Sequence, residues 1–204
     1  KTGGIVLDVR TPGEVARGRI AGASVINLRD KDFGKKISFM RKDKAILVYC
    51  AAGSRSARAA DKLIAAGFPK VYNLSGGIMG WNRAGLPIER GAVAAEASAE
   101  TYSIADFDKL LSRSEPILVD FHTPWCAPCK RMAPIVDKLG KELAGEAHVV
   151  RVDIGASEAL ASKYKISGVP VFAVFKSGKE RWRHSGELSA EALKAQVAKA
   201  AAAE

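Results

Sequence analysis

Short apolar runs alternate with helix-start signals through residues 1–90. The runs expected to form strands are Ile5–Val9, Val25–Ile26, Ala45–Tyr49 and Val71–Tyr72. The segment Thr11-Pro-Gly-Glu14 has the form of a capping box with proline at the first helical position. Helices are also expected at Ser56–Ala66, before Gly67, and at Ile78–Ala84. Because the main strand is apolar on both faces, the pattern predicts an α/β fold whose parallel sheet has helices on both faces.

Residues 100–204 use the same signals in a different order. Helices are expected from Ser103 to about Ser112, after Cys126, and after Ser189. The expected strands are Ile117–Phe121, Val149–Val152, Val171–Phe175 and Glu180–His184. The last two flank Lys176-Ser-Gly178, which predicts a hairpin.

The stretch 91–99 consists almost entirely of small residues and contains no aromatic side chain. It follows Leu86-Pro87 and precedes a fresh helix-start signal. We therefore interpret it as a linker between a domain at 1–90 and a domain at 100–204.

Composition adds a charge asymmetry to this picture. Of the 204 residues, 48% are hydrophobic and 26% are charged, which favours a globular chain over disorder. Residues 1–92 hold 17 basic and 7 acidic residues, whereas 93–204 hold 15 of each, so the whole net charge of +10 lies in the first part. This excess is either a solvated basic face or a field that attracts an anionic ligand. No apolar run reaches the ~20 residues of a membrane helix, and neither a membrane nor a nucleic acid is an expected partner.

One of the three cysteines, Cys50, stands alone at the end of an expected strand. The carboxyl edge of a parallel sheet is the usual place for a ligand. The loop after it consists of Ala51, Ala52, Gly53, Ser54, Arg55 and Ser56. Small residues allow successive backbone amides to converge on a thiolate, an oxyanion or a persulfide, and Arg55 could add a fixed positive charge. The alternative is a buried, inert cysteine.

Together with this loop, several segments resemble the rhodanese family. They are Leu7-Asp-Val-Arg10, Gly18–Ala23, Cys50-x-x-Gly-x-Arg-Ser56, Ser75–Trp81 and Gly85-Leu-Pro87. The resemblance implies that Cys50 carries a persulfide and that Ala51 to Ser56 bind the transferred sulfur. Phosphatases of related architecture have five residues between cysteine and arginine, but four residues separate Cys50 from Arg55, as in sulfurtransferases.

The other two cysteines form the motif Trp125-Cys-Ala-Pro-Cys129, after one expected strand and at the start of a helix. A helix N-terminus stabilises a thiolate, and a cysteine three residues later can close a disulfide. Zinc is the main alternative, but His122, His148 and His184 form no paired motif, so no metal and no cofactor are expected.

The segments Ile117–Lys130 and Ser167-Gly-Val-Pro-Val-Phe172 closely resemble thioredoxin, which implies a mixed sheet flanked by helices. By this resemblance Cys126 is the nucleophile, Cys129 the resolving thiol, and Asp120 the acid that assists proton transfer. Pro170 matches a cis-proline, Gly186 a glycine that keeps the substrate surface open, and Trp125 belongs to that surface. At His122 tryptophan is common in the family, and we expect His122 to be a surface residue rather than one that tunes the site.

Taken together, the two resemblances predict a sulfurtransferase joined to a thiol–disulfide oxidoreductase. Sulfur from thiosulfate or a small persulfide would pass from Cys50 to Cys126 and leave as sulfide, and an external thiol or disulfide reductant would reset the Cys126–Cys129 disulfide. Two alternatives remain: a protein disulfide reductase with a docking module, and a persulfide carrier for another enzyme. We expect a cytoplasmic location, or the bacterial periplasm if an upstream signal segment has been removed.

Overall fold

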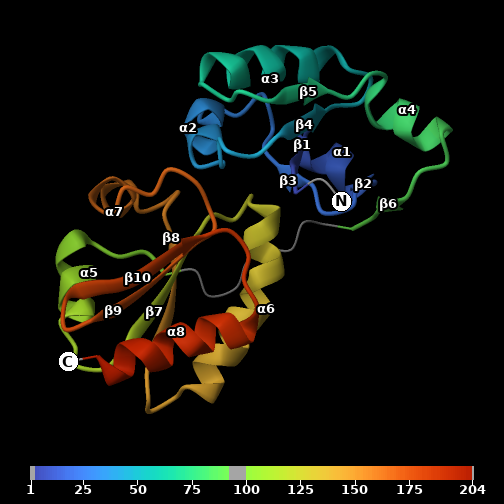
Figure 1. The fold of residues 1–204 in the computed structure, drawn as a ribbon. Coiled ribbons are helices and arrows are strands. Elements are labelled where there is room, and N and C mark those ends of the chain that lie inside the picture. Colours follow the sequence, from blue (N-terminus) through green and yellow to red (C-terminus); the bar gives the residue numbers. More distant parts are fainter. Residues whose placement is uncertain (1–2, 92–99, 204) are drawn as a thin grey trace. The chain divides into compact units, whose positions relative to one another are not determined.

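The computed structural model describes residues 3–91 and 100–203 (Figure 1). The chain divides into two units, Lys1–Ala95 and Glu96–Glu204, and each is described by itself. Of the linker predicted at 91–99, all but Gly91 lies outside the described residues.

The first unit is built on a parallel sheet, as the strand pattern predicts. Its strands are β1 (Ile5–Asp8), β3 (Ser24–Val25), β4 (Ile46–Tyr49) and β5 (Val71–Asn73), in the order β3-β1-β4-β5. The central pair β1 and β4 contributes Leu7, Ile46 and Val48, which have no exposed surface. A short antiparallel pair that the pattern did not predict, β2 (Arg19–Ile20) with β6 (Ile88–Glu89), lies outside this sheet.

The helices of this unit are α1 (Pro12–Ala16), α2 (Phe33–Ser38), α3 (Ser54–Ala65) and α4 (Gly77–Arg83). Helix α3 runs beside β4 and β5 (Figure 1). It begins at Ser54 rather than near Ser56, because Gly53 takes the N-cap position with a φ of 111°. Helix α2 was not predicted, since its two buried residues, Phe33 and Ile37, are too few to make a visible helical period.

A buried ion pair anchors the loop that follows β1. Arg10 Nη2 donates to Asp8 Oδ2 at 2.7 Å and to the Gly18 carbonyl at 2.7 Å. The Arg10 guanidinium lies over the Tyr49 ring, 5.6 Å from its centre. The Tyr49 hydroxyl accepts a hydrogen bond from Ile20 N. Burial, followed by the Asp8 charge, raises the pKa of the Tyr49 phenol, so the hydroxyl stays neutral. This network joins β1, β4 and β2.

The second unit has a mixed sheet with the strand order β10-β9-β7-β8. Its strands are β7 (Ile117–His122), β8 (His148–Asp153), β9 (Val171–Lys176) and β10 (Lys179–Ser185). Strands β7 and β8 run parallel, and the other neighbouring pairs are antiparallel. The predicted hairpin is therefore confirmed, with its turn at Ser177–Gly178.

Helices flank this sheet on both faces, and alternate residues along the strands meet them. The helices are α5 (Ile104–Leu111), α6 (Ala127–Glu142), α7 (Glu158–Lys163) and α8 (Ala190–Ala202). Leu118 and Phe172 pack in one cluster with side chains of α6 and α8. Phe121 and Phe175 instead contact Tyr164, which follows α7, and Tyr164 in turn contacts Phe107 of α5. Within residues 3–91 and 100–203, no helix combines the length and the apolar character that crossing a membrane requires.

The Asp8–Arg10 pair gives a stability prediction. We expect Arg10→Met to destabilise the first unit by about 3–5 kcal/mol, because it leaves a buried carboxylate without its cation. The matched control is Arg41→Met, which breaks an Arg–Asp pair of the same spacing whose carboxylate is exposed, and it should cost less than about 1 kcal/mol. Denaturant unfolding followed by hydrogen exchange of the β1 and β4 amides measures both, and equal losses would contradict a structural role for the buried pair.

Candidate functional site

Cys50 lies directly after β4, and its side chain is enclosed by the loop that leads into α3. It is a free cysteine with only 1% of its surface exposed. Gly53 N donates to Cys50 Sγ at 3.1 Å, and Ser56 Oγ lies 3.4 Å from the same sulfur. The structure thus places the predicted loop around the sulfur, with backbone and hydroxyl donors directed at it.

These donors determine the acidity of the thiol. Burial raises the pKa of Cys50, but the hydrogen bonds from the Ser56 side chain and from the amides of Ser56, Gly53 and Ala52 outweigh it and lower the pKa to about 7. The thiolate form of Cys50 is therefore favoured at neutral pH relative to an ordinary cysteine. Such a sulfur is poised as a nucleophile, which argues against an inert structural cysteine.

Backbone amides at the start of α4 donate hydrogen bonds to the Cys50 loop. Ile78 N donates to the Cys50 carbonyl at 2.9 Å, and Met79 N donates to the Ala51 carbonyl at 3.1 Å. With both carbonyls engaged there, the amides that follow can turn toward the sulfur. Gly77 permits this contact: its φ is +55°, and a Cβ there would lie 2.5 Å from the Cys50 carbonyl oxygen. In the sequence Gly77 stands out only as part of a segment that resembles the rhodanese family, and its role becomes visible in the structure alone.

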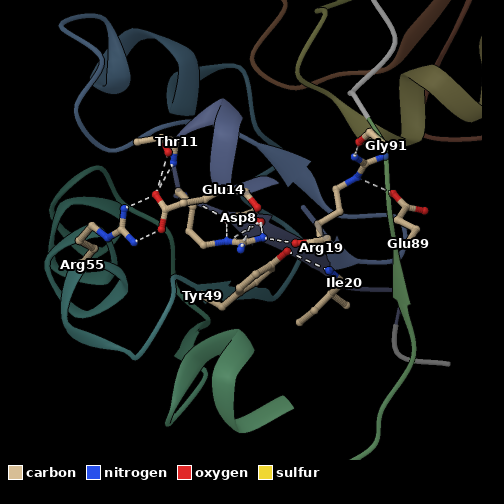
Figure 2. A network of polar contacts seen from close by, with 11 residues as sticks. Asp8, Thr11, Glu14, Arg19, Ile20, Tyr49, Arg55, Glu89 and Gly91 are labelled. Carbon is tan, nitrogen blue, oxygen red and sulfur yellow. Dashed lines mark hydrogen bonds and ion pairs between the residues drawn. The ribbon is translucent and has the colours of Figure 1, made fainter. Parts of the chain in front are cut away.

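Arg55, which the sequence suggests as a fixed positive charge of the loop, forms an ion pair with a residue that sequence reasoning did not connect to it. Its Nη1 and Nη2 donate to the two carboxylate oxygens of Glu14, at 2.8 and 2.5 Å (Figure 2). Glu14 also accepts bonds from the backbone N and the hydroxyl of Thr11. The positive charge of Arg55 is therefore offset by a carboxylate. Ser54 is exposed in the first turn of α3.

The other two cysteines, Cys126 and Cys129, form a disulfide at the start of α6. Cys126 is the N-cap residue of that helix, and its Sγ accepts a bond from Cys129 N at 3.1 Å. Cys126 is 6% exposed and Cys129 is fully buried, so an incoming sulfur reaches Cys126 first. In the described parts of the chain, no group of three or more His, Cys, Asp or Glu side chains is placed to hold a metal ion.

Asp120 is completely buried on β7, and the structure gives it a partner that sequence reasoning missed. Arg151, directly opposite on β8, donates from Nε to Asp120 Oδ2 at 3.1 Å. Arg151 is itself 5% exposed, and its Nη1 lies 3.9 Å from Asp137 of α6. A lone arginine among the valines of β8 was the available signal, because a buried arginine requires an acid close by.

Three further predicted residues are placed by the same unit. Trp125 lies against Gly155, where an added Cβ would come 2.4 Å from the indole ring. The Val169–Pro170 peptide bond is cis, as the resemblance implies, and the Pro170 carbonyl accepts a bond from Gly186 N. The expectation for His122 was wrong: it is fully buried, because β7 is an interior strand covered on both faces.

Comparison with protein families matches both parts of the chain. The family described as thioredoxin matches residues 98–199, and the family described as rhodanese-like domain matches residues 1–84. Each match contains the cysteines whose surroundings are described above.

Individual relatives of this chain also include thioredoxins. Thioredoxin Y, chloroplastic, from Oryza sativa is 39% identical over 58% of this chain and 70% of its own length. Thioredoxin Y1, chloroplastic, from Arabidopsis thaliana is 36% identical over 48% of this chain, and the match spans 56% of that relative. Among solved structures, a mutant thioredoxin from Halobacterium salinarum is 27% identical, with a TM-score of 0.47 over 54% of this chain and 97% of that one.

The acidity of Cys50 can be tested by its alkylation rate. In the oxidised protein Cys50 is the free thiol, so the rate with iodoacetamide should rise with pH around a midpoint near 7. We expect Ser56→Ala to raise that midpoint by about one pH unit, since a hydrogen bond to a charged group contributes ~1.5 kcal/mol. Ser38→Ala, a change at an exposed hydroxyl in α2, serves as control, and identical midpoints for all three proteins would contradict the assignment.

The contact between the start of α4 and the Cys50 loop can be tested at Gly77. Gly77→Ala should destabilise the first unit by roughly 1–2 kcal/mol or more, because alanine resists a positive φ and its Cβ would collide with two carbonyls. It should also raise the alkylation midpoint of Cys50. Gly34→Ala is the matched control, because a Cβ at Gly34 in α2 meets nothing within 4 Å. A Gly77→Ala protein with unchanged stability and midpoint would exclude this role.

Proposed function

We propose, from the premise that this chain belongs to the thioredoxin family and joins a rhodanese-like domain to the thioredoxin domain, that it transfers sulfane sulfur to a dithiol and releases it as sulfide. The thioredoxin domain supports a role as a disulfide oxidoreductase. Our proposal goes beyond this role by assigning a sulfurtransfer reaction to Cys50. The observation that carries it is the enclosed Cys50 thiol with a pKa of about 7 among converging donors.

In the first half-reaction the Cys50 thiolate attacks the outer sulfur of thiosulfate. The sulfur–sulfur bond of the donor breaks, sulfite leaves with the electron pair, and Cys50 becomes a persulfide. With a small persulfide as donor, a thiolate leaves instead. The amides of Ala52, Gly53 and Ser56 that lower the pKa of Cys50 are suited to hold the negative outer sulfur of that persulfide.

In the second half-reaction the Cys126 thiolate attacks the outer sulfur, and Cys50 leaves as a thiolate. Cys129 then attacks Cys126, a disulfide forms, and hydrosulfide departs. The two electrons that reduce the sulfane sulfur come from the Cys126–Cys129 dithiol. An external thiol reductant restores the dithiol. Asp120, held by Arg151, is assigned to accept the proton of Cys129, and Pro170 and Trp125 to the surface that receives the substrate.

A second candidate keeps the two domains independent. In that case the thioredoxin domain reduces protein disulfides and the rhodanese-like domain docks partners. The observation in its favour is that the relatives compared above carry the name thioredoxin alone. If the protein is instead a persulfide carrier for another enzyme, Cys50 takes up sulfur but the Cys126–Cys129 dithiol is not needed. The cytoplasmic location stays a prediction.

Complementary variants of the whole chain separate these functions. Cys50→Ser cannot load sulfur, and Cys126→Ser can load sulfur but cannot reduce it. The unmodified, reduced protein should release sulfide from thiosulfate in a single turnover at a rate independent of protein concentration, because linked sites raise the effective concentration to roughly millimolar.

An equimolar mixture of the two variants must transfer sulfur between molecules. Its rate should therefore fall in proportion to concentration over a hundredfold dilution into the micromolar range. Equal rates for the mixture and the unmodified protein at every dilution would favour independent domains. Failure of Cys126→Ser to gain one sulfur in mass after exposure to thiosulfate or cysteine persulfide would exclude sulfurtransfer at Cys50.

A further inference from the structure

Glu14 lies in α1, 41 residues before Arg55, yet the two side chains form a two-pronged ion pair beside the Cys50 loop (Figure 2). The pair is partly shielded from water, with 22% of the Glu14 side chain and 16% of the Arg55 side chain exposed. Thr11 adds two donors to the same carboxylate. The Arg55 guanidinium, followed by these donors, lowers the pKa of Glu14 far below its usual range, so Glu14 is ionised at any physiological pH.

The charges next to this pair are also balanced. Arg10 is paired with Asp8, and its Nη1 contacts the backbone carbonyl of Glu14 rather than its carboxylate. Arg55 lies close enough to Cys50 that the thiolate contributes to raising its pKa, although Glu14 contributes most. The Cys50 loop therefore combines amide and hydroxyl dipoles with the Arg55 guanidinium, whose charge is offset by Glu14 as that of Arg10 is by Asp8.

We propose that Glu14 is a positioning residue that holds Arg55 and sets the charge of the sulfur donor, so that the loop favours a singly charged persulfide over a dianion such as thiosulfate. This inference rests on the proposed sulfurtransfer at Cys50. A monoanion matches the partial positive charge of a few converging dipoles. A dianion finds less positive charge there, because the Glu14 carboxylate accepts a hydrogen bond from each terminal nitrogen of Arg55, offsets its charge and repels a second negative charge.

The test compares loading of Cys50 by two donors. Cys50 loading, seen as one added sulfur in the intact mass, is timed with cysteine persulfide, a monoanion, and with thiosulfate, a dianion. The oxidised protein is used, so that the Cys126–Cys129 pair takes no part. In Glu14→Gln the loading rate with thiosulfate, relative to that with cysteine persulfide, should rise about fivefold, which corresponds to ~1 kcal/mol from the loss of one unit charge near the protein surface.

Two further variants separate local charge from other effects. Glu89→Gln changes the total charge of the chain equally and also removes a Glu–Arg pair of the first unit, here with Arg19, so it should leave the donor ratio unchanged. Glu14→Asp keeps the charge and should retain the ratio of the unmodified protein. An equal loss with both donors in Glu14→Gln, or the same rise in Glu89→Gln, would overturn the proposal.

A binding measurement keeps this inference distinguishable from the proposed function. Sulfate is a dianion that cannot donate sulfur, and its protection of Cys50 against iodoacetamide requires no transfer. In the unmodified protein, sulfate should protect no better than chloride at equal ionic strength, whereas in Glu14→Gln it should slow alkylation severalfold. Specific protection of the unmodified protein would refute the inference even if Glu14→Gln fails to fold. If no donor loads Cys50 in any variant, the proposed function fails, while the sulfate result still decides on Glu14.

Discussion

The hydrogen bonds that fix the backbone behind Cys50 are the constraint on which the first unit's chemistry depends. A sulfur anion can be buried only if several donors converge on it, and backbone amides converge only if their carbonyls find partners elsewhere. Ile78 and Met79 supply those partners by binding the carbonyls of Cys50 and Ala51. Gly77 makes the approach possible because it carries no Cβ and tolerates a positive φ. The start of α4 thus supports the loop whose donors, from Ser56, Gly53 and Ala52, lower the pKa of the thiol.

The second unit solves a related problem with a different arrangement. Cys126 occupies the N-cap of α6. Its sulfur therefore accepts a hydrogen bond from a backbone N–H within the helix rather than from a surrounding loop. It remains slightly exposed, while Cys129 is covered. One sulfur can therefore meet a partner while the other closes the disulfide. The chain thus holds one sulfur enclosed by its loop and one slightly exposed sulfur at the start of a helix.

Paired charges recur behind both sites. The Asp8–Arg10 pair fixes the loop that follows β1, whereas Glu14 with Arg55 and Asp120 with Arg151 join segments that are far apart in the sequence. Breaking one such buried pair leaves an unpaired charge, which makes it costly to lose. The net charge of the first part, which suggests an attracting field, therefore does not describe the immediate surroundings of Cys50, where Glu14 compensates Arg55. Overall charge and local charge are separate properties of this unit.

The sequence by itself determined what depends on neighbours along the chain. Apolar runs located the main strands, capping residues located helix starts, and the spacing of Cys50 to Arg55 and of Cys126 to Cys129 singled out both candidate sites. Short elements such as β2, β6 and α2 were not predicted, because each has at most two buried residues and these make no visible period. Only the tertiary structure decided the partners: Glu14 for Arg55, Arg151 for Asp120, and the start of α4 for the Cys50 loop. It also decided that His122 is buried. The physical reason is that burial and charge pairing depend on which strands and helices become neighbours, and residue spacing along one strand carries no information about the element that packs against it.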